Sequence, residues 1–175
     1  MQIDMPPALA RRPVHRNGPL PIPWANEYDE PKGVARADFT TVNNDRIIEA
    51  AESGLCGACG EELDHWVAFV GSLQSAQLHS FGFPPMHEKC ARYALLVCPH
   101  IAQAQPRRVP RESSYARRRD VPQFWDERRP TTWVLGITHD FKLLDVMGYP
   151  VFFAAPFKEE HVFNYDEHGQ LHQVI

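Results

Sequence analysis

All four cysteines of this 175-residue chain fall within one quarter of it, close to several histidines. Cys56 and Cys59 form a Cys-x-x-Cys pair in the segment CGACG, where glycines at 57 and 60 permit a tight backbone turn around a metal ion. Such a knuckle supplies two thiolates, whereas a structural zinc site takes four ligands in a tetrahedron. The spacing therefore predicts a zinc site that a second pair of ligands completes.

The second pair is expected in the segment PPMHEKCARYALLVCPH, residues 84–100. His87 and Cys90 are three residues apart in the first turn of a predicted helix, so both side chains can reach one ion. Cys98 follows Cys90 by eight residues, a rise of about 12 Å on a continuous helix, which is too far for a shared zinc. We therefore predict four zinc ligands, namely Cys56, Cys59, His87 and Cys90.

Other ligand sets remain open at this point. His100, beyond the helix-ending Pro99, is the first alternative to His87, and His79 is another. The four cysteines are also compatible with reduced core thiols and no metal, although paired ligands at this spacing are typical of zinc. Cys98 completes an apolar stripe of the helix and is expected in the core. Three thiolates and one imidazole would fill the site, which favours a structural role over a catalytic one.

The elements that must position these side chains follow from local patterns. A helix is expected from about Asn44 to Ser53, with Asn43 or Asn44 as its cap and Gly54 as its end, leading directly into the cysteine loop. Residues 65–83 are aromatic and β-branched in their first half and favour two strands with a turn near 71–75. Short strand-like runs with short turns after residue 131 predict an antiparallel β-meander.

Together these elements predict an α+β fold: a treble-clef-like zinc module of knuckle, β-hairpin and helix, a C-terminal antiparallel β-meander, and an extended proline-rich N-terminal arm. The arm is either a disordered tail or an ordered strap across the domain. One compact domain is expected to contain four segments, which are the arm (1–38), the helix with the zinc module (39–102), an Arg/Pro-rich connector (103–130) and the antiparallel β segment (131–175).

The order of knuckle, hairpin and ligand-bearing helix over residues 54–100 resembles the treble-clef zinc finger. The chain is also similar to a group of actinobacterial and actinophage proteins with a proline-rich lead, a Cys-x-x-Cys and a helix of the type C-x-x-C-A-R-[FY]-A…C-P. Residues 87–99, HEKCARYALLVCP, match that helix, with His87 in place of its first cysteine. The resemblance implies a zinc module and a phage-related protein, and it implies no activity.

The connector carries a basic run beside Tyr115, Phe124 and Trp125. Arginines near aromatic residues suit a nucleic-acid backbone with stacked bases, but a solvated linker paired with the acidic C-terminal half explains them as well. The formal net charge of -4 favours the linker. The candidate nucleic-acid-binding residues are Arg107, Arg108, Arg111, Arg117, Arg118 and Arg119.

The residues favour a non-enzymatic, zinc-stabilised interaction or adaptor protein with a protein partner, and nucleic-acid binding is the alternative. A zinc nuclease of the HNH type is a distant third hypothesis, because His79 would have to act as its base and no Asp-His pair precedes it. No signal peptide is visible, and the longest apolar run, residues 149–157, is shorter than the roughly 20 residues of a spanning helix. We therefore expect a cytoplasmic protein with no membrane partner.

Overall fold

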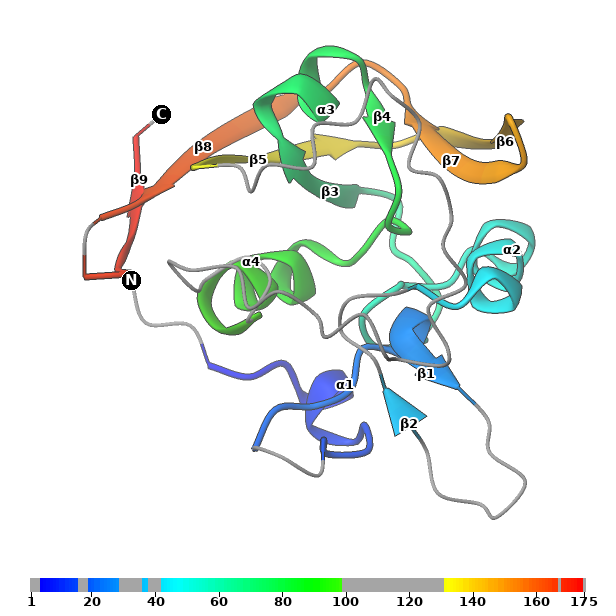
Figure 1. The fold of residues 1–175 in the computed structure, drawn as a ribbon, viewed down its shortest axis with the longest axis horizontal. Coiled ribbons are helices and arrows are strands. Elements are labelled where there is room, and N and C mark those ends of the chain that lie inside the picture. Colours follow the sequence, from blue (N-terminus) through cyan, green and yellow to red (C-terminus); the bar gives the residue numbers. More distant parts are fainter. Residues whose placement is uncertain are drawn as a thin grey trace.

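The computed structural model describes residues 4–15, 19–28, 36–37, 42–98, 131–166 and 168–174. They form short helices and antiparallel sheets, which confirms the predicted α+β class (Figure 1). The helices are α1 (Pro7–Ala10), the 3-10 helix η1 (Trp24–Asn26), α2 (Asn44–Ser53), α3 (Leu73–Gln77) and α4 (Glu88–Val97). The strands are β1 (Glu27–Tyr28), β2 (Arg36–Ala37), β3 (Val67–Ser72), β4 (Ser80–Phe81), β5 (Thr132–Thr138), β6 (Phe141–Val146), β7 (Tyr149–Ala154), β8 (Glu159–Tyr165) and β9 (Leu171–Gln173).

Helix α2 has the predicted bounds and the predicted signals at both ends. The Asn43 side chain accepts a hydrogen bond from the backbone N–H of Asp45 at 3.0 Å, which caps the helix. Gly54 ends it in the left-handed conformation, with φ of 63°. Ile47 is buried, whereas Ile48 is exposed. The helix therefore ends at a defined residue, two positions before Cys56, the first residue of the cysteine loop.

The C-terminal strands are antiparallel as predicted, but they do not follow one another as a simple meander. One sheet has the strand order β3-β5-β8-β9, and a second has the order β4-β7-β6, so the β6–β7 hairpin leaves the sheet between β5 and β8. Val151 and Phe152 of β7 are adjacent and are both buried. Because adjacent residues of a strand point to opposite faces, β7 needs cover on both sides, which a half-exposed meander does not provide.

The segment predicted as a zinc module also differs from the prediction, because its two strands do not form a hairpin with each other. Strands β3 and β4 lie within the predicted segment, but α3 separates them and each pairs with a strand from the C-terminal half. Ser72 caps α3 by accepting a hydrogen bond from the N–H of Ser75 at 3.0 Å. The order of cysteine loop, strands and helix is retained. In place of a hairpin partner, β3 meets the entry to α4 through a bridge between Ala68 and Met86.

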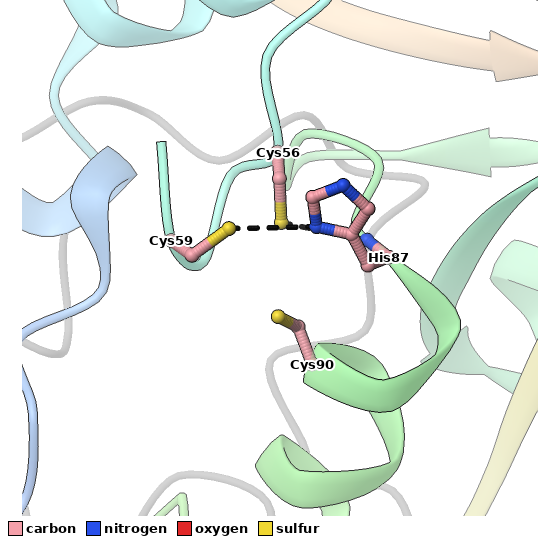
Figure 2. A group of neighbouring side chains, drawn as sticks. All are labelled: Cys56, Cys59, His87 and Cys90. Atoms are coloured by element: carbon pink, nitrogen blue, oxygen red, sulfur yellow. Dashed lines mark hydrogen bonds between the residues drawn. The ribbon is translucent and has the colours of Figure 1, made fainter. Parts of the chain in front are cut away.

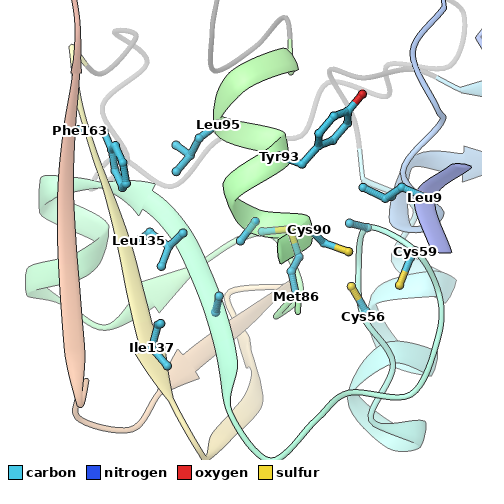
Figure 3. Packing of buried hydrophobic residues seen from close by; sticks show 13 residues of the cluster. Leu9, Cys56, Cys59, Met86, Cys90, Tyr93, Leu95, Leu135, Ile137 and Phe163 are labelled. Atoms are coloured by element: carbon cyan, nitrogen blue, oxygen red, sulfur yellow. The ribbon is translucent and has the colours of Figure 1, made fainter. Parts of the chain in front are cut away.

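Two apolar clusters hold these layers together. The first lies between α4 and the four-stranded sheet, where Leu95, Leu135 and Phe163 are fully buried, and it continues to the cysteine loop (Figure 3). The second joins the two sheets: the ring of Phe69 on β3 stacks on that of Phe81 on β4 with centroids 4.8 Å apart. The C-terminal strands therefore share their core with the cysteine loop, β3, β4 and α4.

The first part of the predicted arm packs on the cysteine loop as an ordered strap. Leu9 is 4% exposed and belongs to the same cluster as the three cysteines of the loop and of α4. The backbone N–H of Trp24 donates to Ala58 O, and that of Ala25 donates to Gly57 O, both at 2.9 Å. The Arg46 guanidinium lies 4.7 Å from the centre of the Trp24 ring. Described residues of the arm are thus part of the structure that encloses the cysteine loop.

The contact between the arm and the loop can be tested at Gly60. This residue has φ of 78°, and an added Cβ would lie 2.4 Å from Cδ1 of Trp24. We expect Gly60→Ala to lower the free energy of unfolding by about 2–4 kcal/mol, from backbone strain together with overpacking. Urea denaturation with zinc present measures the loss.

Gly54→Ala is the matched control for that substitution. Gly54 also has a positive φ, of 63°, but no heavy atom lies within 4 Å of its added Cβ. Its expected loss is the backbone strain alone, about 1 kcal/mol. Equal losses in the two variants would contradict the close contact between Gly60 and Trp24.

Candidate metal centre

The four side chains predicted as zinc ligands lie together between the cysteine loop and the start of α4 (Figure 2). Their ligand atoms, three Sγ atoms and one imidazole nitrogen, all lie within 4.8 Å of one another. Cys56, Cys59 and Cys90 are only 0%, 5% and 2% exposed. Cys56, Cys59 and Cys90 are free thiols, so no disulfide occupies these sulfurs. The group can hold a metal ion.

The spacing of the donor atoms suits a tetrahedral ion. Zinc binds sulfur at about 2.3 Å and imidazole nitrogen at about 2.0–2.1 Å, which places tetrahedral ligand atoms roughly 3.5–3.8 Å apart. Sγ of Cys59 lies 3.4 Å from Nδ1 of His87. The distance between any two of the four ligand atoms is at most 4.8 Å. An ion at the centre therefore requires side-chain shifts of about 1 Å at most.

The backbone around His87 fixes which ring nitrogen faces the sulfurs. Nε2 of His87 lies 2.8 Å from the carbonyl oxygen of Glu62. Because a carbonyl can only accept a hydrogen bond, Nε2 carries a proton, and Nδ1 is the nitrogen that would lose its proton to bind a metal. Since His87 is the N-cap residue of α4, its ring is positioned by the helix on one side and by Glu62 on the other. This arrangement is typical of an oriented metal ligand.

Glycine and helix geometry together shape the loop that carries Cys56 and Cys59. The backbone N–H of Gly60 donates to Cys56 O at 2.8 Å, which closes the tight turn. At Gly57 an added Cβ would meet the Phe83 ring and Pro84 at 2.9 Å, so only glycine fits against the segment that leads into α4. The N–H of His87 donates to Sγ of Cys56 at 3.4 Å. The N–H of the N-cap residue of α4 therefore faces a sulfur, where it stabilises negative charge.

The pKa values of the four side chains also favour a bound cation. Hydrogen bonds from the Cys59 and Cys90 side chains lower the pKa of Cys56 far below its usual value. Hydrogen bonds to the sulfurs of Cys56 and Cys59 raise the pKa of His87 to about 11. Hydrogen bonds to the same two sulfurs raise the pKa of Cys90. Thus, when protons alone occupy the cluster, anionic sulfur is held against cationic imidazole, and a divalent cation would take over the role of those protons.

Arg12 of the arm is a charged neighbour of the centre that the sequence reasoning did not single out. Its side chain is 15% exposed and forms an ion pair with Glu27, and its Nε donates to Ile22 O at 3.2 Å. Burial lowers the pKa of Arg12, whereas the negative charge of Cys59 acts in the opposite direction. The only signal in the sequence was a pair of arginines within an otherwise apolar, proline-rich segment.

His79 and Cys98 lie outside the four-residue group. The ring of His79 packs on Phe157 with centroids 4.5 Å apart, its buried Nδ1 has no hydrogen-bond partner among the described residues, and the residue is not part of the four-residue group. Cys98 follows α4 outside that group and is half-buried rather than fully buried. His100 and the six arginines at 107–119 lie outside the described residues.

Comparison of the chain with protein-family models, with curated proteins and with solved structures gave no match. In the part of the chain that the structure describes, no helix has the length and apolar character needed to cross a membrane. The class of the site therefore rests on its own geometry, which is that of a Cys3His group between a tight loop and the first turn of a helix.

Proposed function

We propose that this protein is a zinc-stabilised, non-enzymatic interaction protein in which Cys56, Cys59, His87 and Cys90 bind one structural zinc ion. The observation that carries the proposal is the convergence of three buried sulfurs and one oriented imidazole nitrogen within 4.8 Å. Thiolate and imidazole ligands in a tetrahedral arrangement favour zinc over the hard cations magnesium and calcium, which prefer oxygen. The ion would join the cysteine loop to α4.

A structural role follows from the ligand count. A catalytic zinc keeps one position for water or substrate and usually has three protein ligands. Here four protein donors would fill the tetrahedron, and three sulfurs would donate enough electron density to weaken the ion as a Lewis acid. His79, the base that a nuclease would need, packs on Phe157 away from this group. We therefore assign the ion to folding and not to a reaction.

The ion would crosslink several short segments around the cysteine loop, and this crosslink is its proposed role in folding. The cysteine loop is in contact with the arm and with the entry to α4, and that entry is joined to β3 by the Ala68–Met86 bridge. A metal ion that crosslinks these short segments would stabilise them against one another and so maintain a surface for a partner. A protein is the proposed partner. Nucleic-acid binding through the arginine run stays a prediction, because those residues lie outside the described part of the chain.

Metal analysis of the purified protein tests the proposal. We expect one equivalent of zinc per chain, and we expect replacement by Co²⁺ to give the visible bands of a tetrahedral ion and the charge-transfer bands of thiolate ligands. Because the ligands bind metal only when deprotonated, acidification should release the ion and neutralisation should restore it. The absence of stoichiometric zinc, or Co²⁺ bands typical of an octahedral site, would contradict the proposal.

A further inference from the structure

Three segments that are distant in the sequence meet at one end of the four-stranded sheet. Val67 of β3 pairs with Thr138 of β5, and Ile137 of β5 pairs with Glu159 of β8. The residues just before β3, just after β5 and just before β8 therefore lie side by side. Their rings and one ammonium group form a cluster, called here the aromatic end, which consists of His65, Trp66, His139 and Lys158.

The rings of the aromatic end contact one another in defined orientations. The imidazoles of His65 and His139 are nearly parallel, with centroids 6.0 Å apart and an interplanar angle of 22°. The Trp66 ring is roughly perpendicular to both, with its centroid 5.0 Å from that of His65 and 5.7 Å from that of His139. All three residues are exposed, including the large indole of Trp66, which is 40% exposed. An ordered, exposed aromatic group of this kind is more typical of a binding surface than of a core.

One face of Trp66 already receives a cation. Nζ of Lys158 lies 4.4 Å from the centre of the Trp66 ring, and Oε1 of Glu159 lies 3.5 Å from the same nitrogen. An aromatic face on one side and a carboxylate on the other are the usual elements of a site for an ammonium or guanidinium group. The Lys158 side chain is 55% exposed, so its contacts are weak enough for a competing cation to replace it.

The surrounding charge favours a cationic ligand. The segments 64–66, 139–140 and 158–160 together hold four carboxylates, those of Asp64, Asp140, Glu159 and Glu160, and a single ammonium group, that of Lys158. All four acidic residues are exposed. A base could stack on Trp66, but these carboxylates would repel the phosphates of a nucleic acid. The surface is therefore complementary to a basic protein segment.

We infer that the aromatic end is a docking surface for an arginine or lysine side chain of a basic peptide segment in a protein partner, which replaces Lys158 over Trp66. This inference rests on the proposed interaction function. The metal centre is connected to the aromatic end through the backbone segment that precedes Trp66. His87 donates a hydrogen bond to the carbonyl of Glu62, two residues before Asp64. Zinc bound at His87 would therefore help to hold the segment that presents Trp66.

Fluorescence anisotropy with labelled peptides tests the inference on the full zinc-loaded chain. The probes are fluorescein-labelled peptides of alternating glycine and arginine, glycine and lysine, or glycine and glutamate, and a labelled single-stranded oligothymidylate. We expect binding of the two cationic peptides and no binding of the glutamate peptide. Trp66→Ala should weaken binding of the arginine peptide about fivefold or more, because the cation–π contact is lost. Trp66→Leu keeps an apolar side chain and should weaken binding to a similar extent.

The sharpest variant is Lys158→Ala. Because it removes the cation that competes for Trp66, it should tighten binding of the arginine peptide about twofold or more. A phosphate-binding surface would respond in the opposite way, since it would lose a positive charge. Leu78→Ala is the matched surface control: Leu78 is 54% exposed and lies outside the aromatic end, so this variant should bind like the wild type.

Each contrary result has a distinct meaning. Failure of the wild-type protein to bind either cationic peptide, or weaker peptide binding by Lys158→Ala, would overturn the inference. Preferential binding of oligothymidylate that Lys158→Ala weakens would overturn it in favour of a nucleic-acid surface. Zinc is measured in every sample, because a wild-type chain without zinc contradicts the proposed function, whereas a zinc-loaded chain that does not bind the peptides contradicts this inference alone.

Discussion

Cys90→Ser is expected to abolish zinc binding and to unfold the segments around the cysteine loop. Cys90 lies in the first turn of α4 and is 2% exposed, and its cluster includes Leu9 of the arm and Met86 at the bridge to β3. A serine hydroxyl is a poor zinc ligand, and metal binding in small zinc modules contributes about 10–16 kcal/mol, comparable to the net stability of a whole domain of about 5–15 kcal/mol. The loss should therefore exceed the stability of these segments.

Elemental analysis, circular dichroism and thermal unfolding measure the effect, and Cys98→Ser is the matched control. It makes the same chemical change at the end of the same helix, outside the four-residue group. Because Cys98 is only half-buried, we expect this variant to keep its zinc and to lose about 1 kcal/mol or less. Loss of zinc in Cys98→Ser would show that the ligand set is different.

Phe69→Ala is expected to lower the free energy of unfolding by about 3–5 kcal/mol, the usual cost of removing a fully buried phenylalanine side chain. Phe69 on β3 is 1% exposed and joins the two sheets. Its ring centroid lies 4.8 Å from that of Phe81, 6.0 Å from that of Phe141 and 6.4 Å from that of Phe152, all of which belong to the three-stranded sheet. The substitution removes the central ring of this interface and leaves a cavity between the sheets.

Chemical denaturation with zinc present measures this loss, and Phe141→Ala provides the comparison. Phe141 belongs to the rim of the same cluster and is only partly buried, so we expect it to cost about 1–2 kcal/mol. Both variants should retain one equivalent of zinc, because neither residue contacts the metal centre in the described structure. Equal losses in the two variants would contradict the central position of Phe69.

Local patterns were sufficient to predict the four side chains that could hold a metal ion and the helices beside them. The three-residue spacings of Cys56 with Cys59 and of His87 with Cys90 place each pair on one turn of backbone, and no distant contact is needed to bring the members of a pair together. The bounds of α2 follow in the same way from a capping side chain at one end and a left-handed glycine at the other. Such interactions act within a few residues, so the sequence reveals them directly.

The pairing of the strands, by contrast, was decided by the tertiary structure. Residues 65–83 contain two strands, but nothing local indicates that β3 would pair with β5 and β4 with β7 instead of with each other. The aromatic end exists only because that pairing brings Trp66 and His139 together across about seventy residues of sequence. The strap formed by Leu9 and Trp24 over the cysteine loop is likewise a long-range contact.

The amino-acid sequence by itself therefore determined which side chains could hold a metal ion and which helices present them, because both depend on short spacings along one backbone. Only the tertiary structure decided which strands pair, where the arm lies and which exposed residues share a surface. Those features depend on burying apolar faces from segments far apart in the chain, and the free energy of that burial is a property of the whole packed molecule.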